Sequence, residues 1–281
     1  MALRTNRDLL VPMVLVGEVT HPELPWDPFL VSAAGEPYIP LGAGGVLYGY
    51  GPGSPAFAPG DHAEPGATLA APGERQNQAL LGYACLGNPA TAQAGGRSLR
   101  GFVCGLRGEG RGVLASFADE DLEQIHPGCR VAVRCLGTGL RLLDHPEVSL
   151  HHLSPGLLTA LLAEDRGGLV AKVRAEIPSY LLGNGVGRPA ATWEVDLVSD
   201  DRALMGELGL QGLRIGDVVA LPDWEAVTLQ GYAPGALTIG VVVHGDSPLP
   251  GHGPGILPLA STQRDGVLRA VRDPARPILF T

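Results

Sequence analysis

The sequence is poor in positive charge and in aromatic side chains. Lysine occurs once, as Lys172, aromatic residues make up 5% of the chain, and the formal net charge is −9 at pH 7. Binding to a nucleic-acid backbone or to an anionic membrane depends on clustered Lys and Arg, so the lack of any basic run argues against both partners. The scarcity of aromatics also disfavours a base-stacking platform. A small-molecule ligand or another protein is the expected partner.

The sequence also lacks paired cysteine motifs and long apolar runs. Its four cysteines show no C-x-x-C spacing, so neither a zinc knuckle nor a redox pair is indicated and reduced thiols are expected. No apolar run approaches the ~20 residues that a membrane-spanning helix needs. An apolar run at 9–16 follows two arginines, but Asp8 interrupts the charge pattern and no small-residue cleavage site follows. We expect a cytoplasmic protein without membrane contact.

Glycine and proline are abundant instead. The 281 residues include 41 Gly and 25 Pro together with 45% hydrophobic residues, which favours many short strands joined by tight turns over disorder. The β-branched apolar run 239–243 predicts a central buried strand. A turn precedes a Gly-led strand at both 122–133 and 210–221, an arrangement typical of small β-barrels. We therefore expect a mainly β fold with a few short helices, arranged as two β-barrel-like units.

The domain boundary is expected near residue 154. The chain length allows one large β domain or two smaller ones. A helix is expected to begin after Ser154, with Pro155 at its first position. Placing the boundary at this helix gives an N-terminal β domain over 1–153 and a C-terminal β domain over 154–281.

The densest group of proton-active side chains follows the most apolar predicted strand. His244 and Asp246 stand two residues apart, so in an extended chain both would point to one face. His252 then lies in a loop rich in Gly and Pro, where Gly253 and Gly255 leave open backbone for close approach of a ligand. The competing interpretation is that Gly and Pro simply turn the chain and that the histidines are solvated.

A second polar cluster lies in the N-terminal half. His62 and Glu64 offer an imidazole and a carboxylate to a proton or to a hard metal ion. Asp61 is interpreted differently, because a P-G-D turn before a strand usually has its Asp side chain bonded to its own backbone. Asn77 and Asn88 are candidate ligand-binding residues, and caps or turns explain them equally well.

The order of several idiosyncratic motifs resembles a known family. The stretches are P-G-D-H-A-E-P-G, A-C-L-G-N, G-T-G-L-R-L-L-D-H-P and, above all, I-G-V-V-V-H-G-D-S-P-L-P-G-H-G-P-G. They are similar, along nearly the whole chain, to an uncharacterised prokaryotic family known as domain of unknown function 4438 (DUF 4438). The resemblance implies a mainly β, two-part soluble protein that can self-associate, and it implies no established activity.

The chain departs from that family at residues 221–231. It reads L-P-D-W-E-A-V-T-L-Q-G where the resemblance implies a loop rich in His and Asp, and only Asp223 corresponds. A metal or acid-base site built from such a loop would be altered or lost here. The chain is therefore interpreted as a divergent member, with a new substrate or without catalysis.

Two functions from different classes are open. The first is a soluble enzyme, a hydrolase, lyase or isomerase, that acts on a small polar metabolite. His62 or His244 would be its general base and His252 its acid, while Glu64 or Asp246 would orient the base or bind a divalent metal ion. The second is a non-catalytic module for small-molecule binding or oligomer assembly, with structural histidines. We favour the enzyme slightly and expect a homo-oligomer.

Overall fold

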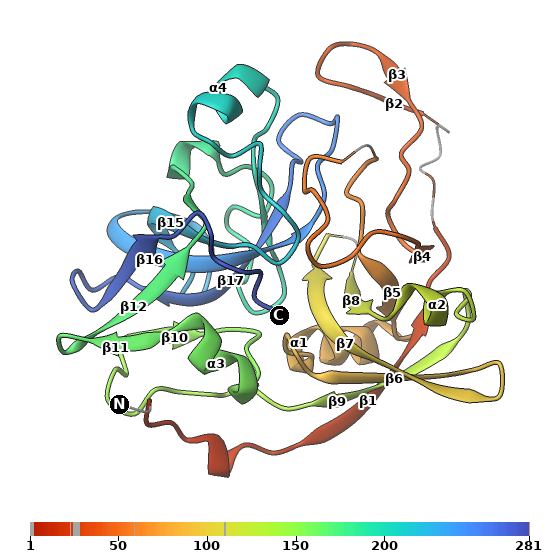
Figure 1. Ribbon diagram of the computed structural model, residues 1–281, viewed down its shortest axis with the longest axis horizontal. Helices are drawn as coiled ribbons and strands as arrows, with labels where there is room; N and C mark the ends of the chain where they lie inside the picture. Colours follow the sequence, from red (N-terminus) through yellow and green to blue (C-terminus); the bar gives the residue numbers. More distant parts are fainter. Residues whose placement is uncertain (1–2, 23, 25–28, 59, 110, 281) are drawn as a thin grey trace.

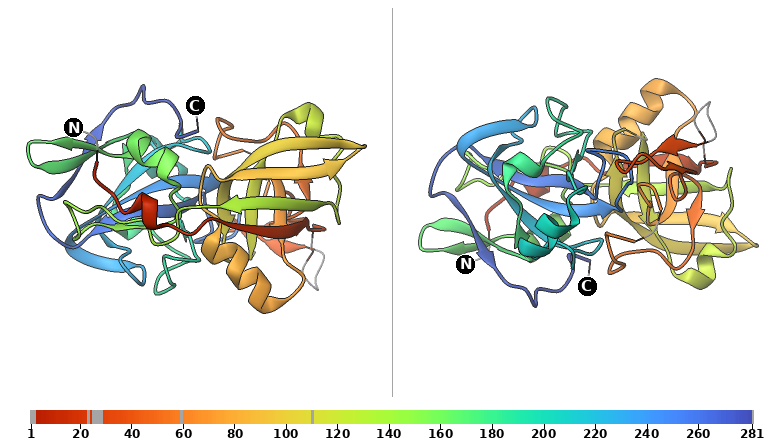
Figure 2. Two further views of the ribbon diagram at one scale, coloured as in Figure 1. Left: turned by 90° about the horizontal axis from the view of Figure 1, so that it is seen from below. Right: turned by 90° about the horizontal axis from the view of Figure 1, so that it is seen from above.

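The computed structural model describes residues 3–22, 24, 29–58, 60–109 and 111–280. It is mainly β, with short helices at its periphery, which confirms the fold class expected from the composition. Figure 1 shows the barrel strands on one side of the molecule and the C-terminal sheets on the other, and the two units lie side by side in both views of Figure 2. The described residues contain no helix that is long and apolar enough to cross a membrane.

The N-terminal unit is a closed, antiparallel β-barrel. Around the barrel its strands are β1 (Met13–Val19), β9 (Arg130–Cys135), β6 (Pro89–Ala94), β7 (Arg97–Arg107), β8 (Gly112–Ser116) and β5 (Gly66–Ala70). β5 pairs back to β1 through Val19 and Leu69, which closes the ring. The side chains alternate as a half-buried strand requires: on β9, Val131 and Val133 are buried while Arg130 is exposed.

Short elements surround the barrel. They are the 3-10 helix η1 (Arg7–Leu9), β2 (Leu30–Val31), β3 (Pro37–Tyr38), β4 (Val46–Leu47), α1 (Glu74–Tyr83) and α2 (Asp119–Leu122). α1 packs on the barrel through Leu80 and Leu81, which are buried. α2 begins with acidic residues, as the helix dipole favours.

The C-terminal unit is built from two sheets. The larger contains β10 (Ser149–Leu150), β17 (Gly255–Thr262), β16 (Gly231–His244), β15 (Val218–Glu225) and β13 (Ala175–Glu176), with β14 (Val195–Asp196) also paired to β17. The smaller contains β11 (Ala163–Asp165), β12 (Gly168–Val173) and β18 (Leu268–Arg272). The helical elements are α3 (Pro155–Leu161), η2 (Ser179–Leu181) and α4 (Arg202–Glu207). The run 239–243 is a central buried strand segment, as predicted.

One hydrophobic core connects the two units. It runs from barrel residues such as Leu69 and Val103 to Val243 on β16. β7 packs closely on β16 because Gly105 has no side chain: a Cβ there would lie 2.8 Å from the Cβ of Val243. This contact brings the turn after β7 next to the end of β16, and the polar site lies at that junction.

All four cysteines are buried and unbridged, in agreement with the expectation of reduced thiols. Burial raises the pKa of Cys85 and of Cys104 to about 12. A thiol with so high a pKa is a poor nucleophile, and both Cys85 and Cys104 are buried core residues.

Candidate metal centre

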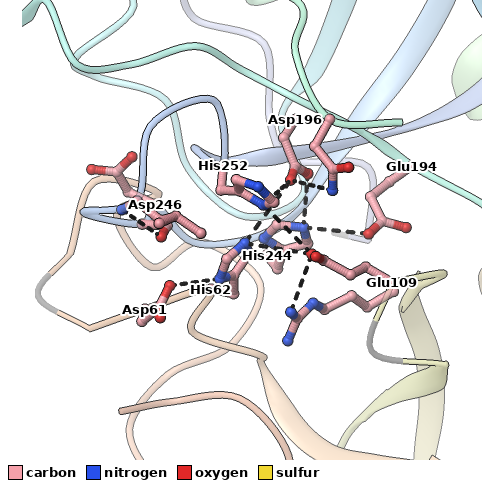
Figure 3. Close-up of polar contacts among 12 residues, drawn as sticks. Asp61, His62, Glu109, Glu194, Asp196, His244, Asp246 and His252 are labelled. Atoms are coloured by element: carbon pink, nitrogen blue, oxygen red, sulfur yellow. Dashed lines mark hydrogen bonds and ion pairs between the residues drawn. The ribbon is translucent and has the colours of Figure 1, made fainter. Parts of the chain in front are cut away.

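Six ionisable side chains meet where the barrel joins the C-terminal unit (Figure 3). They come from the loop before β5, the turn between β7 and β8, the residue before β14 and β14 itself, the end of β16 and the loop before β17. In chain order they are His62, Glu109, Glu194, Asp196, His244 and His252. His62, His244 and His252, which the sequence selected, therefore lie together. The ring centroid of His62 is 5.4 Å from that of His244 and 5.5 Å from that of His252.

Four of these residues form a first donor group. His62 Nε2 lies 3.8 Å from Glu109 Oε2 and 3.9 Å from Asp196 Oδ2. His252 Nδ1 lies 3.6 Å and 3.7 Å from the same two oxygens. These separations are too long for hydrogen bonds, but they are close to the distance of about 3.3 Å between two ligands of a tetrahedral zinc ion with bonds of about 2.0 Å. The four donors are thus spaced around a common point.

Buried polar atoms without partners gather at this point. Among the described residues, His62 Nε2, His244 Nε2, His252 Nδ1 and Asp196 Oδ1 are each shielded from solvent and have no hydrogen bond. Native proteins leave few buried polar atoms unpaired, because each costs about 1–3 kcal/mol. Two of these atoms, His62 Nε2 and His252 Nδ1, belong to the first donor group, and the other two lie beside it, 3.3 Å from each other.

Asp61 fixes the orientation of His62. Asp61 Oδ1 lies 2.6 Å from His62 Nδ1, and both side chains are almost fully buried. Burial alone would raise the pKa of Asp61, but hydrogen bonds from His62 and Ser247 outweigh it and hold the pKa below its ordinary value. The proton of His62 is thereby kept on Nδ1, which leaves Nε2 free as a ligand atom. The interpretation of Asp61 as a backbone-bonded turn residue is wrong.

The backbone of His62 is unusual too. Its φ of 52° lies in the left-handed region, where a residue with a side chain is strained. Its N–H donates to the carbonyl of Asp246 (2.9 Å), so the polar loop of the C-terminal unit holds it in place. Strain of this kind is typical of functional sites, where surrounding contacts enforce a required side-chain direction.

Glu194, Asp196 and His244 form a second donor group that shares Asp196 with the first. His244 Nε2 lies 3.3 Å from Asp196 Oδ1 and 3.7 Å from Glu194 Oε1, without the alignment of a hydrogen bond. Burial alone would lower the pKa of His244, but Asp196 and Glu194 raise it to about 10. Glu194 Oε2 accepts a 2.6 Å hydrogen bond from the Gly108 N–H, which ties this group to the β7–β8 turn.

Gly255 lets His244 reach Asp196. Gly255 on β17 is paired with His244 on β16 and with Asp196 on β14, so it lies between them in the sheet. A Cβ at this position would overlap His244 Nε2, and a Cβ at Gly253 would meet the carbonyl of Leu197. The sequence suggested that the space beside Gly253 and Gly255 is open for a ligand. Protein groups fill that space instead.

Glu64 and Asp246 lie outside both donor groups. Glu64 accepts hydrogen bonds from the Gly44 N–H and from Thr68, and forms a 2.7 Å ion pair with Arg107. Arg107 also reaches Glu109 at 3.4 Å, so Glu64 acts on the site through Arg107.

Asp246 accepts a 2.6 Å hydrogen bond from Ser199 and is ion-paired with Arg202. It points away from His244 (Figure 3). The two would share one face in an extended chain, but β16 ends at His244, and Asp246 contacts Ser199 and Arg202 instead of the donor groups.

The two asparagines have structural partners. Asn77 accepts from the Ala71 N–H at 2.9 Å and donates to the Arg111 carbonyl at 2.7 Å, and it lines a cavity beside the site. Asn88 is bonded to the backbone of Cys85 and Leu136, inside the barrel unit and away from the donor groups.

A cavity of about 430 Å³ opens onto the first donor group. Asp61, His62 and Glu109 form its inner wall, and Glu109, with 35% of its side chain exposed, is the most accessible of the donors. Arg111 and His21, both exposed, line it further out. A small molecule entering this cavity reaches His62 and Glu109.

The sequence analysis missed Glu109, Glu194 and Asp196. Glu109 stands in a Gly-rich turn that carries no recognisable motif. Glu194 and Asp196 are two residues apart in the strand-like stretch 192–198, so their alternation toward one face was an available signal.

The divergent segment 221–231 contributes no side chain to either donor group. It forms parts of β15 and β16 and the turn between them. Asp223 accepts from the Gly235 N–H at 2.8 Å, outside the site. Gln230 donates to the carbonyls of Trp193 and Glu194 at 3.0 and 3.2 Å and supports the backbone that carries Glu194. The six-residue site is therefore assembled without the loop that the resemblance implied.

Comparisons with known proteins agree with the resemblance of the motifs. A family model described as domain of unknown function (DUF4438), N-terminal, matches residues 29–159, and the corresponding C-terminal model matches residues 159–278. The fold is similar to the crystal structure of TM1086, with a TM-score of 0.93 and 31% sequence identity over 99% of this chain and 98% of that chain. No curated protein matches the chain.

Proposed function

Since the chain belongs to the DUF4438 family, whose two models are described as domains of unknown function, we propose its function from the site. The protein is an enzyme that uses a divalent metal ion in acid-base chemistry on a small polar metabolite. Hydrolysis is the reaction that the site supports best. The observation that carries this proposal is that His62 Nε2 and His252 Nδ1, both buried and without a hydrogen bond, face the same carboxylate oxygens of Glu109 and Asp196 at 3.6–3.9 Å.

The donor set suits a transition-metal ion. Imidazole nitrogens with carboxylate oxygens are the common ligands of zinc, iron, manganese and related ions. The local charge favours a cation too, because the carboxylates of Glu109, Glu194 and Asp196 face the centre while the nearby Arg107 is already paired with Glu64. His62, His252 and Asp196 are the proposed ligands of the ion.

Glu109 is the proposed proton acceptor. When bound, a divalent ion at such a site polarises a substrate oxygen and lowers the pKa of a coordinated water. Glu109 lies at the cavity wall, and its Oε2 faces both His62 and His252. Arg107, held by Glu64, contacts Glu109 and keeps its carboxylate directed at the centre. Glu109 is thus placed to take a proton from a water next to the ligands.

The cavity supports a small, anionic substrate. Its volume of about 430 Å³ lies in the range of 300–1,000 Å³ that is common for metabolite sites. Arg111 and His21 line its outer part, and their side chains form no ion pair among the described residues. A carboxylate or phosphate on the substrate would pair with Arg111 while its reactive end lies at Glu109.

The test is metal content. Protein stripped with a chelator and reloaded with zinc or manganese is expected to retain at least one ion per chain by inductively coupled plasma mass spectrometry. The double variant His62→Ala/His252→Ala should retain at least one ion per chain fewer than the wild type, whereas the variant of the exposed His126, His126→Ala, should match the wild type. A wild-type protein that binds neither metal at micromolar concentration would overturn the proposed function.

A further inference from the structure

The two donor groups are distinct, and Asp196 divides its two oxygens between them. Its Oδ2 faces His62 and His252 at 3.9 and 3.7 Å, and its Oδ1 faces His244 at 3.3 Å. From this division we propose that the centre is dinuclear, with Asp196 as the bridging carboxylate. This inference rests on the proposed function for the first ion and adds a second ion, held by His244, Glu194 and Asp196 Oδ1.

His244 and Glu194 each have one atom committed to the protein and one atom free, and Asp196 Oδ2 accepts a 3.3 Å hydrogen bond from Asn184 while Asp196 Oδ1 has no hydrogen bond. His244 Nδ1 is bonded to the Gly245 carbonyl at 3.0 Å, and Glu194 Oε2 accepts from the Gly108 N–H at 2.6 Å. The free atoms, His244 Nε2 and Glu194 Oε1, face Asp196 Oδ1 or each other across 3.3–3.7 Å. Outer hydrogen bonds that fix the free atom of each ligand are a general feature of metal sites.

Burial makes this second group costly unless it is neutralised by a cation. The side chains of Asp196 and His244 are 0% exposed and that of Glu194 is 2% exposed. Two carboxylates and one imidazole in such surroundings leave negative charge in excess when the imidazole is neutral and acts as a ligand. A divalent ion offsets this charge, and it also occupies the unpartnered His244 Nε2 and Asp196 Oδ1.

The rival arrangement is a protonated His244 paired directly with Asp196 and Glu194, with a single ion in the first group. It accounts for the charge but leaves His244 Nε2 without an aligned hydrogen bond. In the dinuclear arrangement the two ions lie side by side, as in hydrolases whose ions are about 3.5–4 Å apart and stabilise the attacking and leaving oxygens together. Figure 3 shows His62, His252 and His244 around the shared Asp196 as this arrangement requires.

The experiment is a manganese titration of the metal-free, full-length protein. Isothermal titration calorimetry is expected to show two equivalents of Mn²⁺, and electron paramagnetic resonance should show the multiline signal of an exchange-coupled pair. His244→Ala should bind one equivalent and give the six-line signal of an isolated ion. Glu194→Gln should do the same, and because it keeps the size of Glu194 it tests the proposal even if His244→Ala misfolds. The control Asp246→Asn should retain two equivalents and the coupled signal.

The outcomes separate the two proposals. One equivalent in the wild type with an isolated-ion signal, or two coupled equivalents in Glu194→Gln, would overturn the dinuclear centre and leave the first site standing. No Mn²⁺ bound by the wild type, in a protein that also fails to retain zinc, would overturn the proposed function and the bridge with it.

Discussion

At the scale of single residues, neighbours in space determine what each polar side chain does. Asp61 and Glu64 stand on either side of His62 in sequence and have different roles. Asp61 holds the His62 ring directly at 2.6 Å, while Glu64 is bound to Arg107 and acts on Glu109 through it. The sequence assigned Asp61 to a turn and only Glu64 to the site. The two carboxylates differ in their partners. Asp61 is also bonded to Tyr38 and Ser247. Glu64 is bonded to Gly44, Thr68 and Arg107.

His152 gives a pH-dependent prediction that is independent of the metal site. It is buried between the carbonyls of Ala84 and Ala190, and burial lowers its pKa to about 4. Because the folded pKa lies below the unfolded value of 6.5, the neutral ring supports the fold above pH 6.5. This support is lost as the pH falls from 6.5 toward 4. Between pH 7.5 and pH 5 the wild type should lose about 2 kcal/mol of stability from this residue.

Urea unfolding of the wild type and of His152→Gln at both pH values measures this loss. The variant should be less stable at pH 7.5 and should lose about 2 kcal/mol less than the wild type on going to pH 5. The corresponding variant of the exposed His126, His126→Gln, should keep the wild-type pH response. Equal pH responses in His152→Gln and the wild type would contradict the prediction.

At the scale of elements, the register of three strands forms the second donor group. β14, β17 and β16 lie side by side, and Gly255 on the middle strand is paired with Asp196 on one side and His244 on the other. Two residues separated by a whole strand contact each other only when that strand carries no side chain between them. A glycine at this position is therefore required by the site as well as by the fold.

The variant Gly255→Ala tests this requirement. The added Cβ would overlap His244 Nε2 and displace the ring, at a cost of about 1–3 kcal/mol for overpacking. We expect the second metal equivalent to be lost in calorimetric titration while the first is retained. Gly231→Ala is the matched control, because Gly231 on β16 has open space around it, and it should behave as wild type. Two equivalents in Gly255→Ala would contradict the requirement.

At the scale of the whole molecule, the site joins the two units. His62 and Glu109 come from segments of the barrel unit, and Asp196 and His252 come from the C-terminal unit. The hydrophobic core runs across the same junction. Exposed apolar side chains such as Leu9, Val11 and Val14 lie along the entry to β1 and on it, and the expected self-association stays a prediction.

Removal of the metal should therefore destabilise both units together. A ligand present at 100 times its Kd stabilises the folded state by about 2.7 kcal/mol, which for a chain of this length corresponds to a fall of several degrees in Tm when the metal is chelated. Differential scanning calorimetry of the loaded and the metal-free protein measures this fall in Tm. Each sample should show a single unfolding transition, which lies at a lower temperature in the metal-free protein. His62→Ala/His252→Ala, measured with and without metal, should show a smaller shift, because only the second donor group remains. A loaded protein in which only one of two separate transitions moves would contradict this coupling.

The sequence by itself determined the class of fold and much of its local structure. Glycine and proline among apolar β-branched runs indicated the mainly β fold and the buried strand at 239–243, because side-chain periodicity and turn chemistry act within a few residues. It also selected His62, His244 and His252.

Only the tertiary structure decided which groups meet. Pairings between segments far apart in the chain decide whether a strand closes a barrel and whether Asp196 lies across Gly255 from His244. Local sequence patterns do not report such pairings. Glu109 and Asp196 carry no motif and gain their roles from the packing of β7 on β16 and of β14 on β17. The site lies at a junction of two units, and neither unit's sequence contains it alone.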